Sequence, residues 1–283
     1  MNINFCIRGG WVIIILFKFF KSPTFIQKLV FNGEVIVFEK STFINRIIET
    51  TRNHFNKIFG VTLEDFFDDN DNLAFSTKER FFFQLQNKIK KCSEIKANFS
   101  NFLKEVGFDT KYVFKDQYSL RYSPKLNGKA FGKLKPTLPH RDTWASNLFD
   151  QINFWFPIHK ISAGNSIYLV PKYFKKKVEN NSKSWTFEKF KKNDDYPSAP
   201  YTKINIQDNE KVSFQLDKGN ILCFSGHQLH GSLQNKKQRI NFETRVIYKS
   251  NLNKIIIPKN YDSNSKVVKK NWFRNITTNK YLD

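Results

Sequence analysis

The stretch Gln151–Ile158, "QINFWFPI", indicates the architecture of the second half of the chain. Its residues alternate between a polar or amphipathic set and an apolar set: Gln151, Asn153 and Trp155 against Ile152, Phe154 and Phe156. A period of two is typical of a β-strand, because successive side chains point to opposite faces of a sheet. The stretch therefore predicts a strand with an apolar core on one face and a different environment on the other.

Similar short runs fill the rest of this half and are separated by Pro, Gly, Asn and Lys. They are "KYVFKDQYSLRYS", "SIYLVP", "KVSFQL", "NILCFSG" and "RINFETRVIY". In the preceding part, about residues 30–107, apolar residues recur at helical spacing after a short β-prone run at Val35–Phe38. Helices followed by a series of strands indicate an α+β protein whose second half is an antiparallel sandwich or barrel.

Capping residues predict the limits of three helices in the first part. The expected starts are Ser41 or Thr42, Ser76 in a capping box with Glu79, and Ser93, and the expected ends include Gly60 and Gly107. We expect one domain, residues 1–283, with mostly helical support at 1–107 and a sheet core at 108–250. A long Lys-rich insert, 172–211, interrupts the core, and a basic tail, 251–283, follows it. Such an insert is usually a lid, a binding loop or a disordered segment.

The composition supports a folded chain with a basic surface. The chain has 283 residues, of which 16% are aromatic, and its 47 Lys and Arg against 25 Asp and Glu give a formal charge of +22. A surplus of this kind suits nucleic acid, anionic lipid or an acidic substrate. Lys greatly outnumbers Arg, the better base-reading residue, so we expect a solvated basic surface and no nucleic-acid partner. A small-molecule substrate, possibly an anionic one, remains compatible with this charge.

Cysteine usage and the N-terminal residues bear on location. The three cysteines, Cys6, Cys92 and Cys223, are far apart and odd in number, which indicates a reducing, cytoplasmic compartment. The apolar run Trp11–Phe17 is shorter than the roughly 20 residues of a spanning helix. It fits a buried strand, and it also fits contact with a membrane surface, which would make the protein peripheral.

Two coordinating side chains stand two residues apart in "PHRDT". In an extended chain His140 and Asp142 face one side and Arg141 the other. A third ligand has to come from elsewhere, and "GHQLHGS" offers His227 and His230 at the end of a predicted strand. Two histidines and one carboxylate on one face of a metal are typical of non-heme Fe(II) oxygenases, which keep the opposite positions open.

In order along the chain, these segments resemble the phytanoyl-CoA dioxygenase family of Fe(II)/2-oxoglutarate oxygenases, most clearly over residues 118–248. The family's HxD matches "HRD", its Trp-containing strand matches "INFWFPIHKISAGNSIYLVPKYF", and its final ligand motif matches "GNILCFSGHQLHGS". The resemblance implies a double-stranded β-helix, the jelly roll of cupins, with supporting N-terminal helices. It also implies that His230, which precedes Gly-Ser, is the third metal ligand rather than His227.

The resemblance further implies an arginine on the following strand that pairs with the far carboxylate of 2-oxoglutarate. Arg239 matches this position best, and Arg245 is the alternative because the two share one strand face. Asn241 stands where the family often has Ser or Thr. The further candidates are Tyr118 and Asn153 for the cosubstrate, and Arg121, Trp144, Asn147 and Trp155 for the substrate.

The function implied is an Fe(II)-dependent dioxygenase that uses 2-oxoglutarate and O2, releases succinate and CO2, and hydroxylates a small-molecule metabolite. In related halogenases a small residue replaces the carboxylate ligand, so Asp142 favours hydroxylation or another oxidation. Two alternatives remain open. One is a non-catalytic jelly-roll protein that binds an anionic partner or a membrane surface. The other is a metal-dependent isomerase or hydrolase on a cupin-like barrel.

Overall fold

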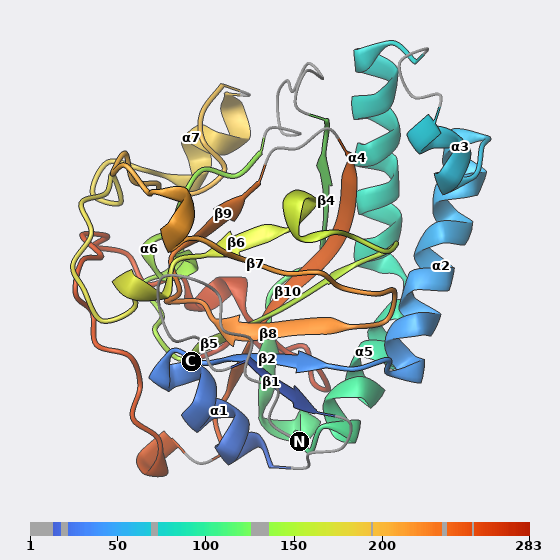
Figure 1. Ribbon diagram of the computed structural model, residues 1–283. Helices are drawn as coiled ribbons and strands as arrows, with labels where there is room; N and C mark the ends of the chain where they lie inside the picture. The colour runs from blue at the N-terminus through green and yellow to red at the C-terminus, as the bar shows by residue number, and fades with distance from the viewer. Residues whose placement is uncertain are drawn as a thin grey trace.

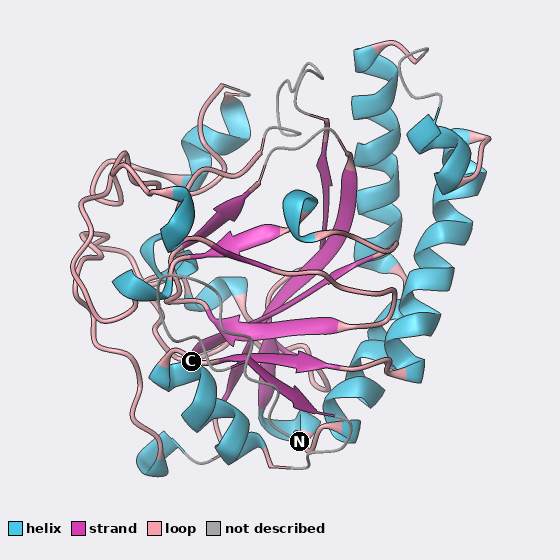
Figure 2. Cartoon of the chain, in the orientation of Figure 1, coloured by secondary structure: helices cyan, strands magenta, loops and turns pink. Residues whose placement is uncertain are grey.

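A computed structural model describes residues 14–17, 22–68, 73–125, 136–193, 195–233, 237–250 and 252–283. Two β-sheets lie beside a layer of helices (Figures 1 and 2). The larger sheet consists of β1 (Ile14–Phe17), β2 (Val35–Phe38), β8 (Ile221–Ser225), β5 (Gln151–Pro157), β10 (Arg239–Tyr248), β3 (Val113–Lys115) and β11 (Arg274–Asn275) in that order, with β4 (Ser119–Ser123) also paired to β10. The smaller sheet has the order β7 (Val212–Ser213), β6 (Ile167–Leu169), β9 (His230–Ser232).

Nearly all the strand pairs are antiparallel, and their register separates two environments. The exception is β1, which runs parallel to β2. In the central pair, Asn153 of β5 lies opposite Arg245 of β10, and Trp155 lies opposite Glu243. The intervening residues Ile152, Phe154, Phe156, Ile240, Phe242 and Val246 are buried in one cluster with the helices. The predicted alternation of both strands is therefore confirmed.

The helical layer consists of α2 (Thr42–Phe59), α4 (Phe75–Lys91) and α5 (Ser93–Glu105), with α1 (Pro23–Asn32) and α3 (Leu63–Asp68) beside them. Figure 1 shows α2 and α4 side by side along one flank of the larger sheet. The opposite face of that sheet packs on the smaller sheet through a second cluster that includes Trp155, Leu169 and Phe224. The α+β class predicted from the strand pattern and the jelly roll implied by the resemblance are confirmed.

Helix boundaries differ from the expected ones in detail. The capping box at Ser76 is wrong: α4 begins at Phe75, one residue earlier, and no side chain caps it. Ser93 is the first residue of α5 rather than its cap. Helix α1 was not expected, although Ser22 caps it through the backbone N–H of Phe25. These shifts are small because packing of the apolar faces, and not one capping bond, decides where a buried helix starts.

The insert and the tail both pack on the body of the protein. Figure 1 shows them together on the side away from α2 and α4, where the insert forms the short helix α7 (Phe187–Lys192). Phe174, Val178 and Trp185 of the insert are buried, as are Phe273 and Leu282 of the tail. Residues 251–283 are thus a structural segment of the domain and not a free basic extension.

The N-terminal apolar run contains strand β1, whose four residues pair with β2 at the end of the larger sheet. Residues 11–13 of the run lie outside the described residues. Among the helices that the structure describes, none combines the length and the apolar character needed to cross a lipid bilayer.

Candidate active site

His140 and His230 are held opposite each other by their own backbones. The N–H of each donates to the carbonyl of the other, at 2.8 Å from His140 and 2.9 Å from His230. His230 begins β9, while His140 immediately precedes Arg141 and the short helix α6 (Asp142–Ser146). Their imidazole rings lie 4.2 Å apart between centroids. Residues 90 positions apart in the sequence thus present two imidazoles to one point.

Both imidazoles expose the same nitrogen. His140 Nδ1 donates to the carbonyl of Leu138 at 2.8 Å, and His230 Nδ1 donates to the carbonyl of Gln228 at 2.9 Å. A proton on Nδ1 leaves the lone pair on Nε2, the atom that a metal needs. Burial, with the nearby charge of His230, lowers the pKa of His140 to about 3. The ring is therefore neutral near pH 7, as a ligand must be.

Asp142 completes a three-ligand group, in which one donor atom from each residue lies within 4.8 Å of the others. Its Oδ1 is 3.8 Å from His140 Nε2, and its Oδ2 is 3.7 Å from His230 Nε2. Asn153 Nδ2 donates to Oδ2 at 2.5 Å, and Arg245 Nη1 donates to Oδ1 at 3.3 Å. Burial alone raises the pKa of Asp142, but Arg245, the two histidines and the Asn153 bond together lower it to about 2.

The two residues after His230, Gly231 and Ser232, make specific contacts with neighbouring strands. A Cβ atom on Gly231 would lie 2.6 Å from the Tyr168 hydroxyl, so only glycine lets β9 approach β6 here. Ser232 Oγ accepts a hydrogen bond from Arg239 Nη2 at 3.1 Å. The "HGS" sequence therefore combines a candidate metal ligand, a close sheet contact and a partner for the buried arginine.

Arg239 is a buried cation with neutral partners. Only 2% of the residue is exposed, and its guanidinium donates to Asn241 Oδ1 at 3.0 Å, the Asn165 carbonyl at 2.9 Å and Ser232 Oγ. In the described part of the chain no carboxylate lies within 4.0 Å of it. Burial lowers the pKa of Arg239 to about 10, so it stays charged at neutral pH. The charge of Glu243 acts on Arg239 from beyond ion-pair distance, so the guanidinium can still take up an anion.

Arg245 lies on the same face of β10 but faces two acids. Besides Asp142 it pairs with Asp116, which follows β3. Burial opposes its charge, yet the two carboxylates raise the pKa of Arg245 above its usual range. This arginine pairs with the Asp142 carboxylate, and its charge is already compensated by two acids.

The three-ligand group of His140, Asp142 and His230 and both arginines line one cavity of about 1400 Å³. Asn241, also in its wall, keeps its Nδ2 buried without a partner among the described residues while its Oδ1 accepts from Arg239. Trp155 lies under the Arg239 guanidinium, 5.5 Å from ring centroid to Cζ. Aromatic residues of the insert and the tail, among them Trp185, Phe187 and Trp272, form another part of the wall.

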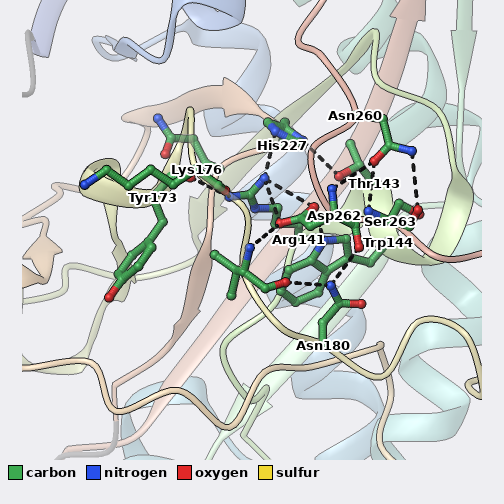
Figure 3. Close-up of polar contacts among 12 residues, drawn as sticks. Arg141, Thr143, Trp144, Tyr173, Lys176, Asn180, His227, Asn260, Asp262 and Ser263 are labelled. Atoms are coloured by element: carbon green, nitrogen blue, oxygen red, sulfur yellow. Dashed lines mark hydrogen bonds and ion pairs between the residues drawn. The ribbon is translucent and has the colours of Figure 1, made fainter.

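Arg141 points away from the three-ligand group, as the period of two in an extended chain predicted. Figure 3 shows it in a buried network with His227, Asp262 and Trp144. His227 Nε2 accepts from Arg141 Nη1 at 2.7 Å, and burial, together with this charge, lowers the pKa of His227 to about 3. His227 thus lies on the other side of the ligand segment, and His230 is the histidine that joins His140 and Asp142.

The other predicted residues divide into two groups. Arg121 and Trp155 line the cavity together with Asn153 and Asn241, and Arg121 Nε donates to Glu243 at 2.7 Å. Trp144 and Asn147 do not line it: Trp144 is fully buried with its indole N–H on Asp262, and Asn147 donates to the Ser265 carbonyl.

The substrate role expected for Trp144 and Asn147 stays a prediction, and the structure places both outside the set of residues that line the cavity. Tyr118 is among the residues that line the cavity, and its ring also packs against Phe99 and Phe242.

Sequence reasoning missed the acids that complete the arginine contacts. In the sequence Asp116 stands at the end of a predicted strand and Asp262 in the tail, and neither belongs to a recognisable motif. No local signal identifies them, because each meets its arginine only through the path of a distant segment. Asn165, whose carbonyl accepts from Arg239, did lie in the quoted segment "AGNSIYLVP", but its side-chain pattern does not reveal a backbone contact.

Comparisons with known proteins give the following findings. No protein-family model matches the sequence, and no curated protein matches it. Solved structures with a similar backbone include the non-heme monooxygenase ThoJ in its apo form. It has 12% identity over 74% of this chain and 72% of that chain, and a TM-score of 0.40. EvdO2 from Micromonospora carbonacea var. aurantiaca, complexed with 2-oxoglutarate, has 11% identity over 59% of this chain and 64% of that chain and a TM-score of 0.38. AviO1 from Streptomyces viridochromogenes Tue57 has 11% identity over 80% and 94% and a TM-score of 0.40. At these scores the assignment of the site rests on its own residues.

Proposed function

We propose that this protein is an Fe(II)- and 2-oxoglutarate-dependent dioxygenase of the phytanoyl-CoA dioxygenase type, which hydroxylates a small molecule in the cytoplasm. One observation carries the proposal. The three-ligand group of His140, Asp142 and His230 shares a cavity with Arg239, a buried cation that has no carboxylate partner among the described residues.

The donor set fits Fe(II). Two imidazole Nε2 atoms and one carboxylate are the ligand set of non-heme iron oxygenases, and the three residues that would hold the ion line the cavity. His140 is neutral and Asp142 ionised near pH 7, so neither has to lose a proton when a metal binds. Bound iron, with 2-oxoglutarate and O2, supplies the oxidising chemistry, in which 2-oxoglutarate becomes succinate and CO2.

The residues around Arg239 fit the cosubstrate. A dicarboxylate that reaches the metal with one end needs a cation for its far carboxylate, and Arg239 would hold it. The unpartnered Nδ2 of Asn241 is a second donor in the same wall. The low dielectric of this buried place strengthens both contacts.

The protein's own contribution is to position the groups and exclude water. Asn153 and Arg245 keep the Asp142 carboxylate turned toward the histidines. The aromatic residues of the insert and tail line the same cavity as Arg239 and are the surface on which we place the substrate. Lysines such as Lys115 and Lys191 also line the cavity, which suits a substrate with an anionic group.

The proposal is tested by titrating the metal-free protein anaerobically with Fe(II) and then with 2-oxoglutarate. We expect a weak visible charge-transfer band, followed by succinate formation when O2 is admitted. His140→Ala and Asp142→Ala should abolish both, while His54→Ala, on α2, should change neither.

A wild-type protein that binds no Fe(II) and forms no succinate would contradict the proposal. The remaining interpretation is then a jelly-roll protein that only binds an anionic partner. Turnover of a substrate without 2-oxoglutarate and O2 would instead indicate an isomerase or a hydrolase.

A further inference from the structure

The residue between the two metal ligands is the centre of a buried polar network (Figure 3). Arg141 is fully buried, and its guanidinium donates to the carbonyls of Tyr173 and Lys176 at 2.5 and 2.9 Å. It also contacts His227, and its Nη1 lies 3.2 Å from Asp262 Oδ2. One side chain therefore joins the ligand segment to the insert and to the tail.

Asp262 is the counterpart of Arg141 and reaches the same two segments. It is 4% exposed. Its Oδ1 accepts from the Trp144 indole N–H at 2.7 Å, and its Oδ2 accepts from the backbone N–H of Val178 at 3.1 Å. Asn180 Nδ2 donates to the Asp262 carbonyl at 2.9 Å, so the backbone is held as well. Trp144 belongs to α6, and Val178 and Asn180 belong to the insert.

We infer that Arg141 and Asp262 are a positioning pair, by which the C-terminal segment orients the metal-ligand segment His140–Asp142 and fixes the insert that forms the cavity wall. The inference rests on the proposed function, since it assumes that the three-ligand group binds a metal. The pair touches neither metal nor substrate, and it acts through the backbone that it holds.

The physical reason lies in the geometry of three consecutive residues. Because Arg141 is anchored on one side of the segment, His140 and Asp142 are constrained to the other side. Without Asp262 the buried charge of Arg141 is left with neutral acceptors alone, which costs free energy and favours movement of the side chain toward water. Any such movement turns the backbone on which both ligands stand. Contacts of this kind beyond the ligands typically change metal affinity about 10- to 100-fold.

The same pair sets the wall of the cavity. Its contacts at Tyr173, Lys176 and Val178 fix the start of the insert, whose later residues Trp185 and Phe187 line the cavity. The tail contributes Trp272, whose ring centroid is 5.2 Å from that of Phe187. Release of Asp262 should therefore loosen the insert as well as the ligands.

The test compares Asp262→Asn with Asp150→Asn in the full-length protein, with Co(II) as the probe. Asparagine has the size of aspartate and retains an oxygen for the Trp144 indole, but it removes the charge. Asp150 is a matched control, because it is also a buried acid, 5% exposed, in an ion pair with Lys249. Binding is measured well below the melting temperature of each variant.

We expect Asp262→Asn to weaken Co(II) binding by about 10-fold or more and to change the visible absorption of bound Co(II), which reports ligand geometry. Hydrogen exchange at the Val178 amide should become faster. Asp150→Asn should lower the melting temperature without either effect on Co(II). The double variant Arg141→Met with Asp262→Asn carries no unpaired charge, so it provides a folded protein that lacks the pair, and it should still bind Co(II) weakly.

Each outcome is decisive. If wild-type protein binds Co(II) and Asp262→Asn and the double variant bind it equally well with an unchanged spectrum, the pair has only a structural role and the inference is overturned. If the wild-type protein binds no Co(II), the proposed function falls, and the inference falls with it.

Discussion

Strand β10 carries two arginines that look equivalent in the sequence and differ in their surroundings. Arg239 and Arg245 are six residues apart, share a strand face and line the same cavity. Arg239 donates only to neutral oxygens, and burial lowers its pKa. Arg245 pairs with Asp116 and Asp142, which raise its pKa.

The difference shows that charge compensation, and not position on the strand, separates a binding arginine from a structural one. A buried cation whose charge is already balanced by two acids has no electrostatic reason to take up a further carboxylate. A buried cation that only neutral dipoles hold can still gain electrostatic free energy by binding a carboxylate. We therefore assign the cosubstrate to Arg239 and the support of Asp142 to Arg245. Substitutions at Arg245, Arg239 and Asn241 test this contrast, and a prediction on pH concerns the histidines of the same fold.

The largest expected effect is on stability, from Arg245→Met. Removing this arginine leaves Asp116 and Asp142 buried without their cation, which typically costs about 3–5 kcal/mol. Arg239→Met should cost less, because removal of a desolvated charge offsets the loss of hydrogen bonds to three neutral acceptors. Urea denaturation of the metal-free proteins measures both free energies of unfolding. Equal losses, or a larger loss for Arg239→Met, would refute the contrast.

The reverse order is expected for binding of 2-oxoglutarate. Arg239→Met should weaken it on the order of 100-fold, the equivalent of about 3 kcal/mol for a lost charge-assisted pair in a buried site. Arg239→Lys should recover only part of this loss, since an ammonium cannot reproduce the two parallel donors of a guanidinium. Isothermal titration calorimetry with metal-loaded protein gives the affinities. An unchanged affinity in Arg239→Met would move the cosubstrate site elsewhere in the cavity.

Acid should destabilise the protein through its buried histidines. Burial, followed by smaller effects that include the charge of Arg239, lowers the pKa of His159 to about 4, and burial and Arg141 lower that of His227 to about 3. Because both values lie below the ordinary 6.5, the unfolded chain takes up protons first. Stability is therefore complete above about pH 6.5 and is lost as the pH falls toward 4 and below.

At pH 5 each histidine should cost on the order of 2 kcal/mol. The check is urea denaturation at pH 7.5 and pH 5 with a chelator present. His159→Gln should reduce the difference between the two pH values. A free energy of unfolding that is the same at both would contradict the prediction.

The smallest effect should come from giving Arg239 the acid that it lacks. Asn241→Asp keeps the shape of the side chain and places a carboxylate where Oδ1 now accepts from Arg239 Nε. This makes Arg239 resemble Arg245, so 2-oxoglutarate should bind about 10-fold more weakly while the protein is no less stable. Calorimetry and thermal denaturation measure the two effects. Asn241→Ser, which adds no charge, is the control and should change affinity less.

Several features of the site could be predicted from the sequence because they are local. The alternation of Gln151–Ile158 and of Arg239–Val246 follows from the two-residue period of a strand, and it placed the polar side chains on one face and the apolar ones against the helices. In "HRD" the same period separated Arg141 from the two ligands. The expected capping box at Ser76 was wrong because a weak local bond does not decide a boundary that packing controls.

Other features depended on contacts between distant parts of the chain. The sequence by itself determined which side chains share a strand face, because backbone geometry repeats every two residues in a strand, and the family resemblance singled out the candidate ligands and the two arginines. Only the tertiary structure decided that Asp116 meets Arg245, that Asp262 meets Arg141 and that Arg239 meets no acid among the described residues. The reason is physical: a charge is compensated by whatever lies within a few ångströms of it, and the paths of the loops that bring those groups together leave no periodic trace in the sequence.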